Sequence, residues 1–233
     1  MRLARHTLVT LDAKLRKSLP DLAVGGLLPP FREAAEAERV RACLAAVNLP
    51  GIVCRPTLKN RGRRIQLGLS FPFRNRDGVR VKSAILVPSS AIASAADPFA
   101  VAGDCGGLNG AVGAVVRALL ACGRGLGVAV GLLGSAALEA ATGLAYVTET
   151  SDVDVLVRGG FEDLKRFSDA AAGIARDSGV AVDVEVELGN GAGVKLAELV
   201  STSQSLLAKS LGAVRLIDRA EVLGLLGPNP VVS

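Results

Sequence analysis

Two aspartates separated by one apolar residue, Asp152 and Asp154, are the side chains of this sequence best suited to chemistry. In a β-strand, residues i and i+2 point to the same side, so one strand would present both carboxylates together. Mg²⁺ is commonly held by one or two carboxylates and by substrate phosphates. Without a cation, two carboxylates at the edge of a buried strand would repel each other. The pair therefore predicts a divalent-metal site with Asp152 and Asp154 as its ligands.

A Gly-Ser dipeptide, Gly134-Ser135, follows the apolar run 128–133, and 16 residues separate Ser135 from Asp152. Glycine after a buried strand lets the backbone approach a ligand closely. Residues 136–141 favour a helix, and the first N–H groups of a helix have no intrahelical acceptor, which suits them to an anion. Gly134 and Ser135 are therefore predicted to bind a phosphate group.

The segment 180–188 supplies a third acid, because Asp183, Glu185 and Glu187 alternate with valines. This alternation predicts a strand with one acidic and one apolar face. A third carboxylate would complete a two-metal site, in which one ion activates an attacking hydroxyl and the other stabilises a leaving diphosphate. The third acid is also the candidate acceptor of the proton of the nucleophile. Glu185 is favoured, with Asp183 as the alternative.

These candidates require strands and helices that bring them together. In the second half, the pattern predicts strands at 128–133, 153–157 and 180–188, helices at 108–122, 136–141, 161–177, 203–211 and 218–226, and a turn at 123–127. In the first half, it predicts strands at 5–11, 52–55, 64–69 and 80–87, a helix at 31–47 and a polar turn at 59–62. The fold class is therefore predicted to be α+β.

Charge divides the chain into two parts. Residues 1–95 contain 17 Lys or Arg and 6 Asp or Glu, a net charge of +11, whereas residues 96–233 contain 10 and 16, a net charge of −6. Residues 89–106, rich in Ser, Ala, Asp, Pro and Gly, are the expected boundary. We predict a smaller basic α+β domain at 1–95 and a catalytic domain at 104–230. A basic surface attracts nucleic acid, a phosphate-rich ligand or an acidic protein.

Composition argues against several other classes of protein. Half of the 233 residues are hydrophobic, which is typical of a folded chain. The longest uncharged apolar stretch, 126–133, is far shorter than the roughly 20 residues of a membrane span. The N-terminal residues lack the apolar segment of a signal peptide, so we expect a cytoplasmic protein. The four cysteines have no CxxC spacing, which argues against zinc and favours reduced thiols in the core.

The strings around the candidate residues resemble one enzyme family. Leu133-Gly134-Ser135, 142–146 (TGLAY) and 151–156 (SDVDVL) are similar to those of the malonate decarboxylase holo-acyl-carrier-protein synthases, also called phosphoribosyl-dephospho-CoA transferases. The order strand-Gly-Ser-helix, Asp-x-Asp and a later acid resembles the polymerase-β nucleotidyltransferase superfamily. The 16-residue gap is longer than is usual there, and Val184 stands where the family usually has Gly. The resemblance implies a nucleotidyltransferase-type mixed sheet with helices in the C-terminal domain.

The resemblance also implies a reaction and its partners. Triphosphoribosyl-dephospho-CoA would bind with its triphosphate at Gly134-Ser135 and at Mg²⁺ held by Asp152 and Asp154. A serine of the apo acyl-carrier protein subunit of malonate decarboxylase would attack the α-phosphorus, and diphosphate would leave. The partner would thus supply the nucleophile, in agreement with a chain whose only histidine is His6 and which has no Ser/His/Asp or Cys/His arrangement.

Basic residues between positions 55 and 82 are predicted to bind the phosphates of the donor or an acidic surface of the carrier protein. The candidates are Arg55, Arg63, Arg64, Arg80 and Lys82. The alternative is a solvated basic face without a ligand.

Three other functions stay open at this stage. The first is the same transfer to the carrier protein of citrate lyase. The second is a nucleotidyltransferase acting on RNA or a small molecule; RNA-binding surfaces usually combine basic with aromatic residues, and only Phe71 and Phe73 lie in the basic segment, which argues against nucleic acid. The third is a non-catalytic module, against which the paired aspartates argue.

Overall fold

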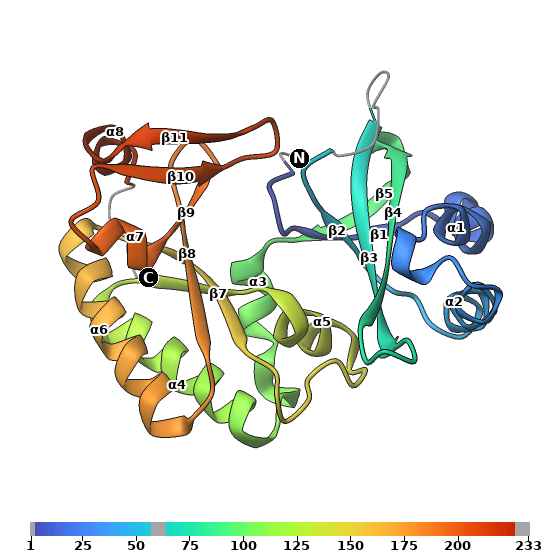
Figure 1. Cartoon of the computed structure of the whole chain (residues 1–233), viewed down its shortest axis with the longest axis horizontal. Coiled ribbons are helices and arrows are strands. Elements are labelled where there is room, and N and C mark those ends of the chain that lie inside the picture. The colour runs from blue at the N-terminus through green and yellow to red at the C-terminus, as the bar shows by residue number, and fades with distance from the viewer. Residues whose placement is uncertain (1–2, 57–63, 227–233) are drawn as a thin grey trace. The chain divides into compact units, whose positions relative to one another are not determined.

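The computed structural model describes residues 3–56 and 64–226. The chain divides into two compact units, Met1–Asp97 and Pro98–Ser233, each of which has its own sheet and its own helices (Figure 1). The predicted α+β fold class is therefore confirmed. The division falls between Asp97 and Pro98, inside the segment 89–106. None of the helices in the described residues has the length and apolar character that crossing a membrane requires.

The first unit is built on a five-stranded antiparallel sheet with the strand order β4-β3-β2-β1-β5. Two helices lie beside each other next to this sheet (Figure 1). Its core includes alternate residues of β4 and the buried Leu67, Leu69 and Phe71 of β3. The elements are β1 (Leu8–Leu11), α1 (Ala13–Gly25), η1 (Pro29–Phe31), α2 (Ala34–Ala46), β2 (Gly51–Val53), β3 (Arg64–Arg74), β4 (Arg80–Pro88), η2 (Ser89–Ala91) and β5 (Ile92–Ala96).

The second unit is built on a six-stranded sheet with the order β11-β10-β9-β8-β7-β6. Its pairs are antiparallel except for β7 and β8, which are parallel and are connected by α6. The elements are α3 (Pro98–Gly103), η3 (Cys105–Gly107), α4 (Gly110–Leu126), β6 (Ala129–Leu132), α5 (Gly134–Thr142), β7 (Val153–Arg158), α6 (Phe161–Ser178), β8 (Val182–Glu187), β9 (Gly193–Lys195), α7 (Leu196–Val200), β10 (Ser205–Lys209), β11 (Val214–Asp218) and α8 (Arg219–Gly224).

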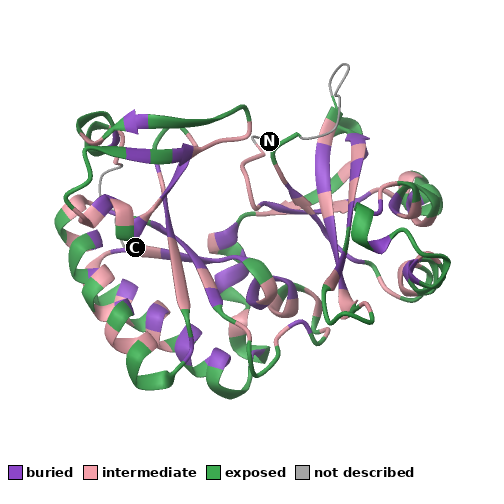
Figure 2. Cartoon of the chain, viewed as in Figure 1, coloured by how far each residue is buried: buried purple, intermediate pink, exposed green. Residues whose placement is uncertain are grey.

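One face of the second sheet is covered by α4. A Cβ atom on Gly123 of α4 would lie 2.5 Å from Cγ2 of Val130, so the helix backbone packs directly against β6. Val130 is paired with Val157 in β7, and Val153, Val155 and Val157 are fully buried. The valines of β7 therefore point toward α4 and belong to the core of this unit. Figure 2 colours the buried parts of the chain purple.

The opposite face carries the polar residues of the sheet. Gly131 of β6 is paired with Leu156, and a Cβ atom on Gly131 would lie 2.8 Å from Pro98 in α3. The short helix α3 therefore covers part of the face to which Leu156 belongs. Since alternate residues of a strand share a face, Asp154 lies on this same side.

Several predicted elements differ from the structure. The helix predicted at 203–211 is wrong, because residues 205–209 form strand β10 in a hairpin with β11. The predicted boundary segment 89–106 contains β5 and α3, and the predicted turn 123–127 is mostly the end of α4. Helix α1 was not expected, and the polar turn predicted at 59–62 lies outside the described residues.

Candidate active site

The predicted phosphate site and the first acidic strand meet at one end of the second sheet. Strand β6 ends at Leu132, which is paired with Val155 near the start of β7. The N–H of Leu133 then donates to the backbone oxygen of Asp154 at 3.0 Å. Gly134 is the next residue and begins α5. The strand pairing therefore fixes the start of α5 next to Asp154.

Gly134 lies against the carboxylate of Asp154. Its φ angle is +61°, a region that favours glycine, and a Cβ atom at this position would lie 2.3 Å from Oδ2 of Asp154. The glycine thus allows the carboxylate to approach the first turn of α5, where backbone N–H groups are directed toward an anion. A phosphate bound at Gly134-Ser135 would have Asp154 as its neighbour, which requires a cation between the two negative groups.

Asp183 is the acid of β8 that lies beside Asp154. The parallel register pairs Asp154 with Asp183 and Leu156 with Glu185. Neighbours in register point to the same face of a sheet, so Asp154 and Asp183 are adjacent on the face opposite α4. Asp152 is exposed and precedes β7 by one residue, at the same end of the sheet.

Glu185 lies farther from this end of the sheet. It is 8% exposed, and a Cβ atom on Gly193 would lie 1.8 Å from its Oε1. Gly193 is the partner of Glu187 in the β8–β9 pair, so the Glu185 carboxylate is directed along the strand away from Asp183. Of the two candidates for the third acid, Asp183 has the position next to Asp154, and Glu185 does not.

Two ion pairs neutralise acids on the same face. Lys195, at the end of β9, donates from Nζ to Oδ2 of Asp183. At the opposite end of β7, Arg158 pairs with Glu187, and its guanidinium lies 4.1 Å from the ring centre of Phe99. Lys195 is a site residue that the sequence analysis missed, because it is brought to Asp183 by the pairing of β9 with β8 and not by a local motif.

A second missed residue, Glu139 of α5, fixes the loop that leads to Asp152. Its Oε2 accepts hydrogen bonds from the backbone N–H groups of Tyr146 at 2.8 Å and Val147 at 2.7 Å. The Tyr146 side chain is fully buried, so this tyrosine packs in the core of the unit. The long gap between Ser135 and Asp152 is therefore filled by α5 and a loop that is held by the carboxylate of α5 itself.

We expect Glu139→Ala to lower the thermal unfolding midpoint by about 3–10 °C, because two partly buried N–H groups lose their acceptor at a cost of about 1–3 kcal/mol. Glu139→Gln keeps a side-chain oxygen and is expected to unfold close to the original temperature. Differential scanning calorimetry of both variants checks this. Equal midpoints for the Ala and Gln variants would contradict the role of Glu139 as an acceptor.

The acids at this end of the sheet suit an ion that is shared with a ligand. Within residues 3–56 and 64–226, no three His, Cys, Asp or Glu side chains are grouped closely enough to form a metal site by themselves. Asp154 and Asp183 are two neighbouring carboxylates, and the absence of a side chain on Gly134 lets the Asp154 carboxylate lie against the start of α5. Mg²⁺ is often held by one or two carboxylates and completed by substrate phosphates. The residues present fit this mode of binding better than an all-protein metal cage.

Of the predicted basic residues, the four that the structure describes lie in the first unit and do not form a single cluster there. Arg80 and Lys82 are two residues apart on β4 and share one face, and Arg80 also donates to the backbone oxygen of Phe71 at 3.2 Å. Arg64 begins β3 opposite Pro88, at the other end of the β3–β4 pair. Arg55 is exposed after β2, and Arg63 lies outside the described residues.

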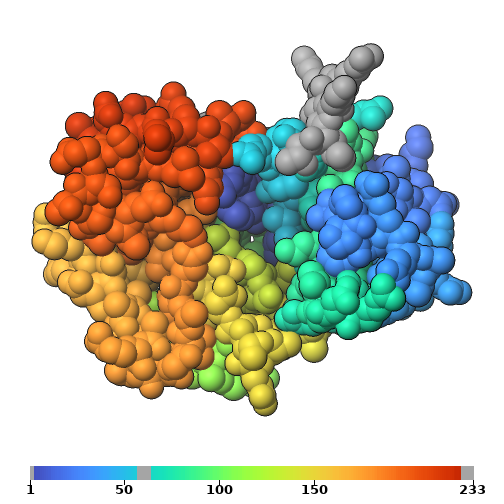
Figure 3. Space-filling model, in the orientation of Figure 1, coloured from blue at the N-terminus to red at the C-terminus, as the bar shows by residue number. Residues whose placement is uncertain are grey.

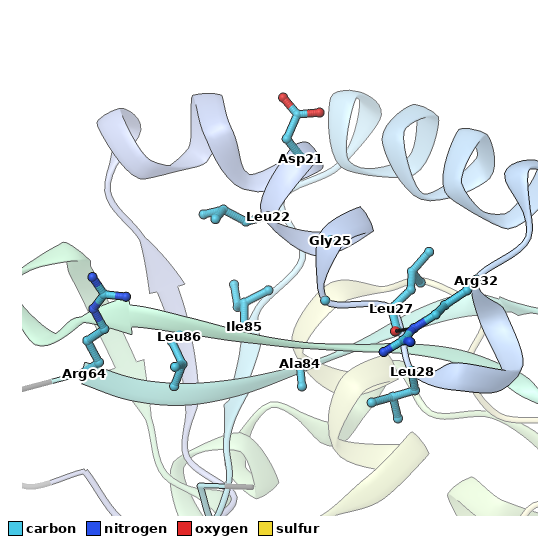
Figure 4. A pocket seen from close by; sticks show the side chains of 11 residues that line it. Asp21, Leu22, Gly25, Leu27, Leu28, Arg32, Arg64, Ala84, Ile85 and Leu86 are labelled. Atoms are coloured by element: carbon cyan, nitrogen blue, oxygen red, sulfur yellow. Dashed lines mark hydrogen bonds between the residues drawn. The ribbon is translucent and has the colours of Figure 1, made fainter. Parts of the chain in front are cut away.

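A cavity of about 410 Å³ lies in the first unit between α1 and β4 (Figure 4). Its lining is mostly apolar and includes Leu22, Ile85 and Leu86, and Arg64 and Arg32 lie at its two ends. The Nε of Arg32 donates to the backbone oxygen of Leu27 at 3.1 Å. The lining of this cavity suits a ligand with an apolar body and an anionic end.

The cysteines have the properties of structural thiols. All four are free. Burial raises the pKa of Cys43 and Cys122, and it raises the pKa of Cys54 despite the opposing effect of a hydrogen bond from Gln66. Since the thiolate is the reactive form, these three residues are poor nucleophiles. The sequence analysis predicted reduced thiols in the core; the four thiols are free, but each is only partly buried and none belongs to the core.

Comparison with known sequences assigns both units to one family of transferases. A model of the phosphoribosyl-dephospho-CoA transferase MdcG N-terminal domain matches residues 4–98. A model of the C-terminal domain of the same transferase matches residues 102–220. The chain therefore belongs to the phosphoribosyl-dephospho-CoA transferase MdcG family, as the sequence motifs predicted.

A curated relative carries the same name. The chain is 37% identical over 91 residues to a phosphoribosyl-dephospho-CoA transferase of Bradyrhizobium diazoefficiens. The match covers 39% of this chain, and it spans 40% of the length of the relative. No solved structure was found to match the chain.

Proposed function

We propose that this protein transfers the phosphoribosyl-dephospho-CoA group from triphosphoribosyl-dephospho-CoA to a serine of the apo acyl-carrier subunit of malonate decarboxylase. Membership of the transferase family supports the class of reaction. The observation that carries the proposal is the meeting of Gly134, Asp154 and Asp183 at one end of the second sheet. A phosphoryl-group transfer requires a site that binds the phosphates and a site that holds a metal ion. The start of α5 can bind a phosphate, and the two adjacent carboxylates can hold the metal ion.

The first part of the mechanism is the binding of the donor triphosphate. The N–H groups at the start of α5, around Gly134 and Ser135, would donate to phosphate oxygens. Asp154 and Asp183, with exposed Asp152 nearby, would hold Mg²⁺ between the chain and these oxygens. Bound Mg²⁺ would neutralise charge on the phosphates and polarise the reacting phosphorus centre.

The chemical step exchanges one phosphorus–oxygen bond for another. The serine oxygen of the carrier forms a bond to the α-phosphorus, and the bond from that phosphorus to the β-phosphate oxygen breaks. Diphosphate leaves with the electron pair of the broken bond, and the serine proton passes to a carboxylate at the site. Asp183 is our candidate for this base in place of Glu185, because it is the acid beside Asp154.

The proposal is tested by incubating the purified protein with Mg²⁺, triphosphoribosyl-dephospho-CoA and the apo carrier subunit. We expect the mass of the carrier to increase by one phosphoribosyl-dephospho-CoA group for each carrier molecule, with release of one diphosphate. A carrier whose acceptor serine is replaced by alanine is the control and should gain no mass. Intact-protein mass spectrometry measures both results.

The same assay separates the alternatives. Faster modification of the citrate lyase carrier than of the malonate decarboxylase carrier would redirect the partner assignment. Labelling of RNA by ordinary nucleoside triphosphates, with no change in either carrier, would refute the proposal in favour of a different nucleotidyltransferase. No reaction with any of these acceptors would also refute it.

A further inference from the structure

The ion pair between Lys195 and Asp183 lies inside the proposed site and has no role in the mechanism given above. The two side chains are partly exposed, at 33% for Lys195 and 47% for Asp183. A pair that is open to solvent contributes little to the stability of a fold. Its position at the third carboxylate therefore points to a role in ligand binding.

The backbone brings Lys195 to the reacting end of the sheet. Strand β9 runs antiparallel to β8 and pairs Lys195 with Glu185. From that position the lysine side chain extends to Asp183, toward the end where Asp154 and Gly134 lie. The next residue begins α7, and buried Leu196 anchors the chain at this point.

Lys195 and a divalent cation would compete for the same carboxylate. Oδ2 of Asp183 accepts a hydrogen bond from the Lys195 ammonium group. While it does so, this oxygen is not fully available to coordinate a metal ion. When a metal ion binds together with a triphosphate, the ammonium group can bind the negatively charged phosphates instead of Asp183. The carboxylate is then available to the metal ion. A flexible lysine with three N–H donors can make this exchange without movement of the backbone.

We propose that Lys195 is an exchangeable counter-ion, which pairs with Asp183 in the donor-free protein and binds the diphosphate portion of the donor when Mg²⁺ occupies the site. This inference rests on the proposed function of the site. Its consequence is that the protein binds Mg²⁺ weakly by itself and binds Mg²⁺ and the donor together strongly. The lysine then also holds the diphosphate as its bond to the α-phosphorus breaks, which stabilises the developing charge.

The test measures two affinities of purified variants by isothermal titration calorimetry: that for Mg²⁺ alone, and that for inorganic diphosphate at saturating Mg²⁺. We expect Lys195→Ala to bind Mg²⁺ alone more tightly, by about two- to fivefold, because an exposed competing ion pair is removed. The same variant should bind diphosphate at least about tenfold more weakly, because a hydrogen bond to a charged group is lost. Lys195→Arg should restore most of the diphosphate affinity.

Arg158→Gln is the matched control, because Arg158 forms an ion pair with Glu187 on this face of β7 and β8, at the end far from Asp183. It should leave both affinities unchanged. The exchange is supported if Lys195→Ala binds Mg²⁺ more tightly and diphosphate more weakly while Arg158→Gln changes neither affinity. Unchanged affinities, or shifts of both in the same direction, would overturn it, and Lys195→Met replaces the alanine variant if the latter does not fold.

These binding measurements need no carrier protein, so they are judged separately from the transfer reaction. If the original protein fails to modify any carrier, the proposed function is wrong. If it modifies the carrier while Lys195→Ala retains the original affinities for Mg²⁺ and diphosphate, the role of Lys195 is wrong and the proposed function stands.

Discussion

Asp154→Asn is expected to lower the rate of group transfer by about a thousandfold, since metal stabilisation of the transferring phosphoryl group contributes several kcal/mol and each 1.36 kcal/mol corresponds to a factor of ten. The position of Asp154 explains this effect. This acid lies both beside Gly134 at the start of α5 and beside Asp183 in the strand register. An amide keeps the shape of the side chain but is a weaker ligand for Mg²⁺ and carries no charge.

The mass-spectrometric transfer assay, followed over time, measures this loss. Asparagine is nearly isosteric with aspartate, so we expect the thermal midpoint to stay within about 4 °C of the original value. Asp183→Asn should show a loss of similar size, whereas Glu185→Gln should retain more activity because Glu185 is directed toward Gly193. Full activity of Asp154→Asn, or a smaller loss in Asp183→Asn than in Glu185→Gln, would contradict the site as described.

The second large effect is expected from Gly134→Ala, which should reduce transfer by about a hundredfold, because displacement of a reacting or metal-binding group by about 1 Å can have this cost. The added Cβ atom would lie 2.3 Å from Oδ2 of Asp154, so the carboxylate must move. The φ angle of +61° also disfavours alanine and adds a stability cost of about 1–2 kcal/mol.

Gly143→Ala separates these two effects. Gly143, the C-cap residue that follows α5, has a φ angle of +69°, but a Cβ atom there would meet no other atom within 4 Å. This variant should be destabilised to a similar extent while it keeps most of its activity. Calorimetry gives the stability and the transfer assay gives the rate. If the two variants lost activity equally, backbone strain alone would explain the effect of Gly134→Ala.

The acidic strands were predictable because valine recurs at every second position in both, although apolar Leu156 interrupts the polar face of β7. Valines at 153, 155 and 157 are buried, and Asp154 lies on the other face, so the period of two in the sequence reflects the two faces of the sheet directly. The choice between Asp183 and Glu185 could not be made in this way, because both side chains lie on the same face of β8. It depends on the register of β8 against β7, a pairing between segments that are distant in the sequence, which the local pattern does not reveal.

The errors arose where tertiary pairing overrides local preference. The residues of β10, Ser-Leu-Leu-Ala-Lys, include good helix formers, but Leu206 and Ala208 are buried and Leu207 is exposed, as pairing with β11 requires. On the space-filling surface, the segment around this hairpin forms a solvent-facing edge of the second unit (Figure 3). Helix α1 had a usable signal that was missed: Asp12 accepts a hydrogen bond from the N–H of Leu15 at 2.7 Å as an N-cap.

The parallel alignment of β7 and β8 has a consequence for the quality of any preparation of this protein. A slip of one residue would turn Asp183 from the face of Asp154 to the face that α4 covers, because side chains alternate with a period of two. Molecules with this one-residue slip would lack a third carboxylate beside Asp154. Low specific activity caused by such a slip would therefore reflect the fraction of molecules in the native register, while each native molecule would turn over at its normal rate.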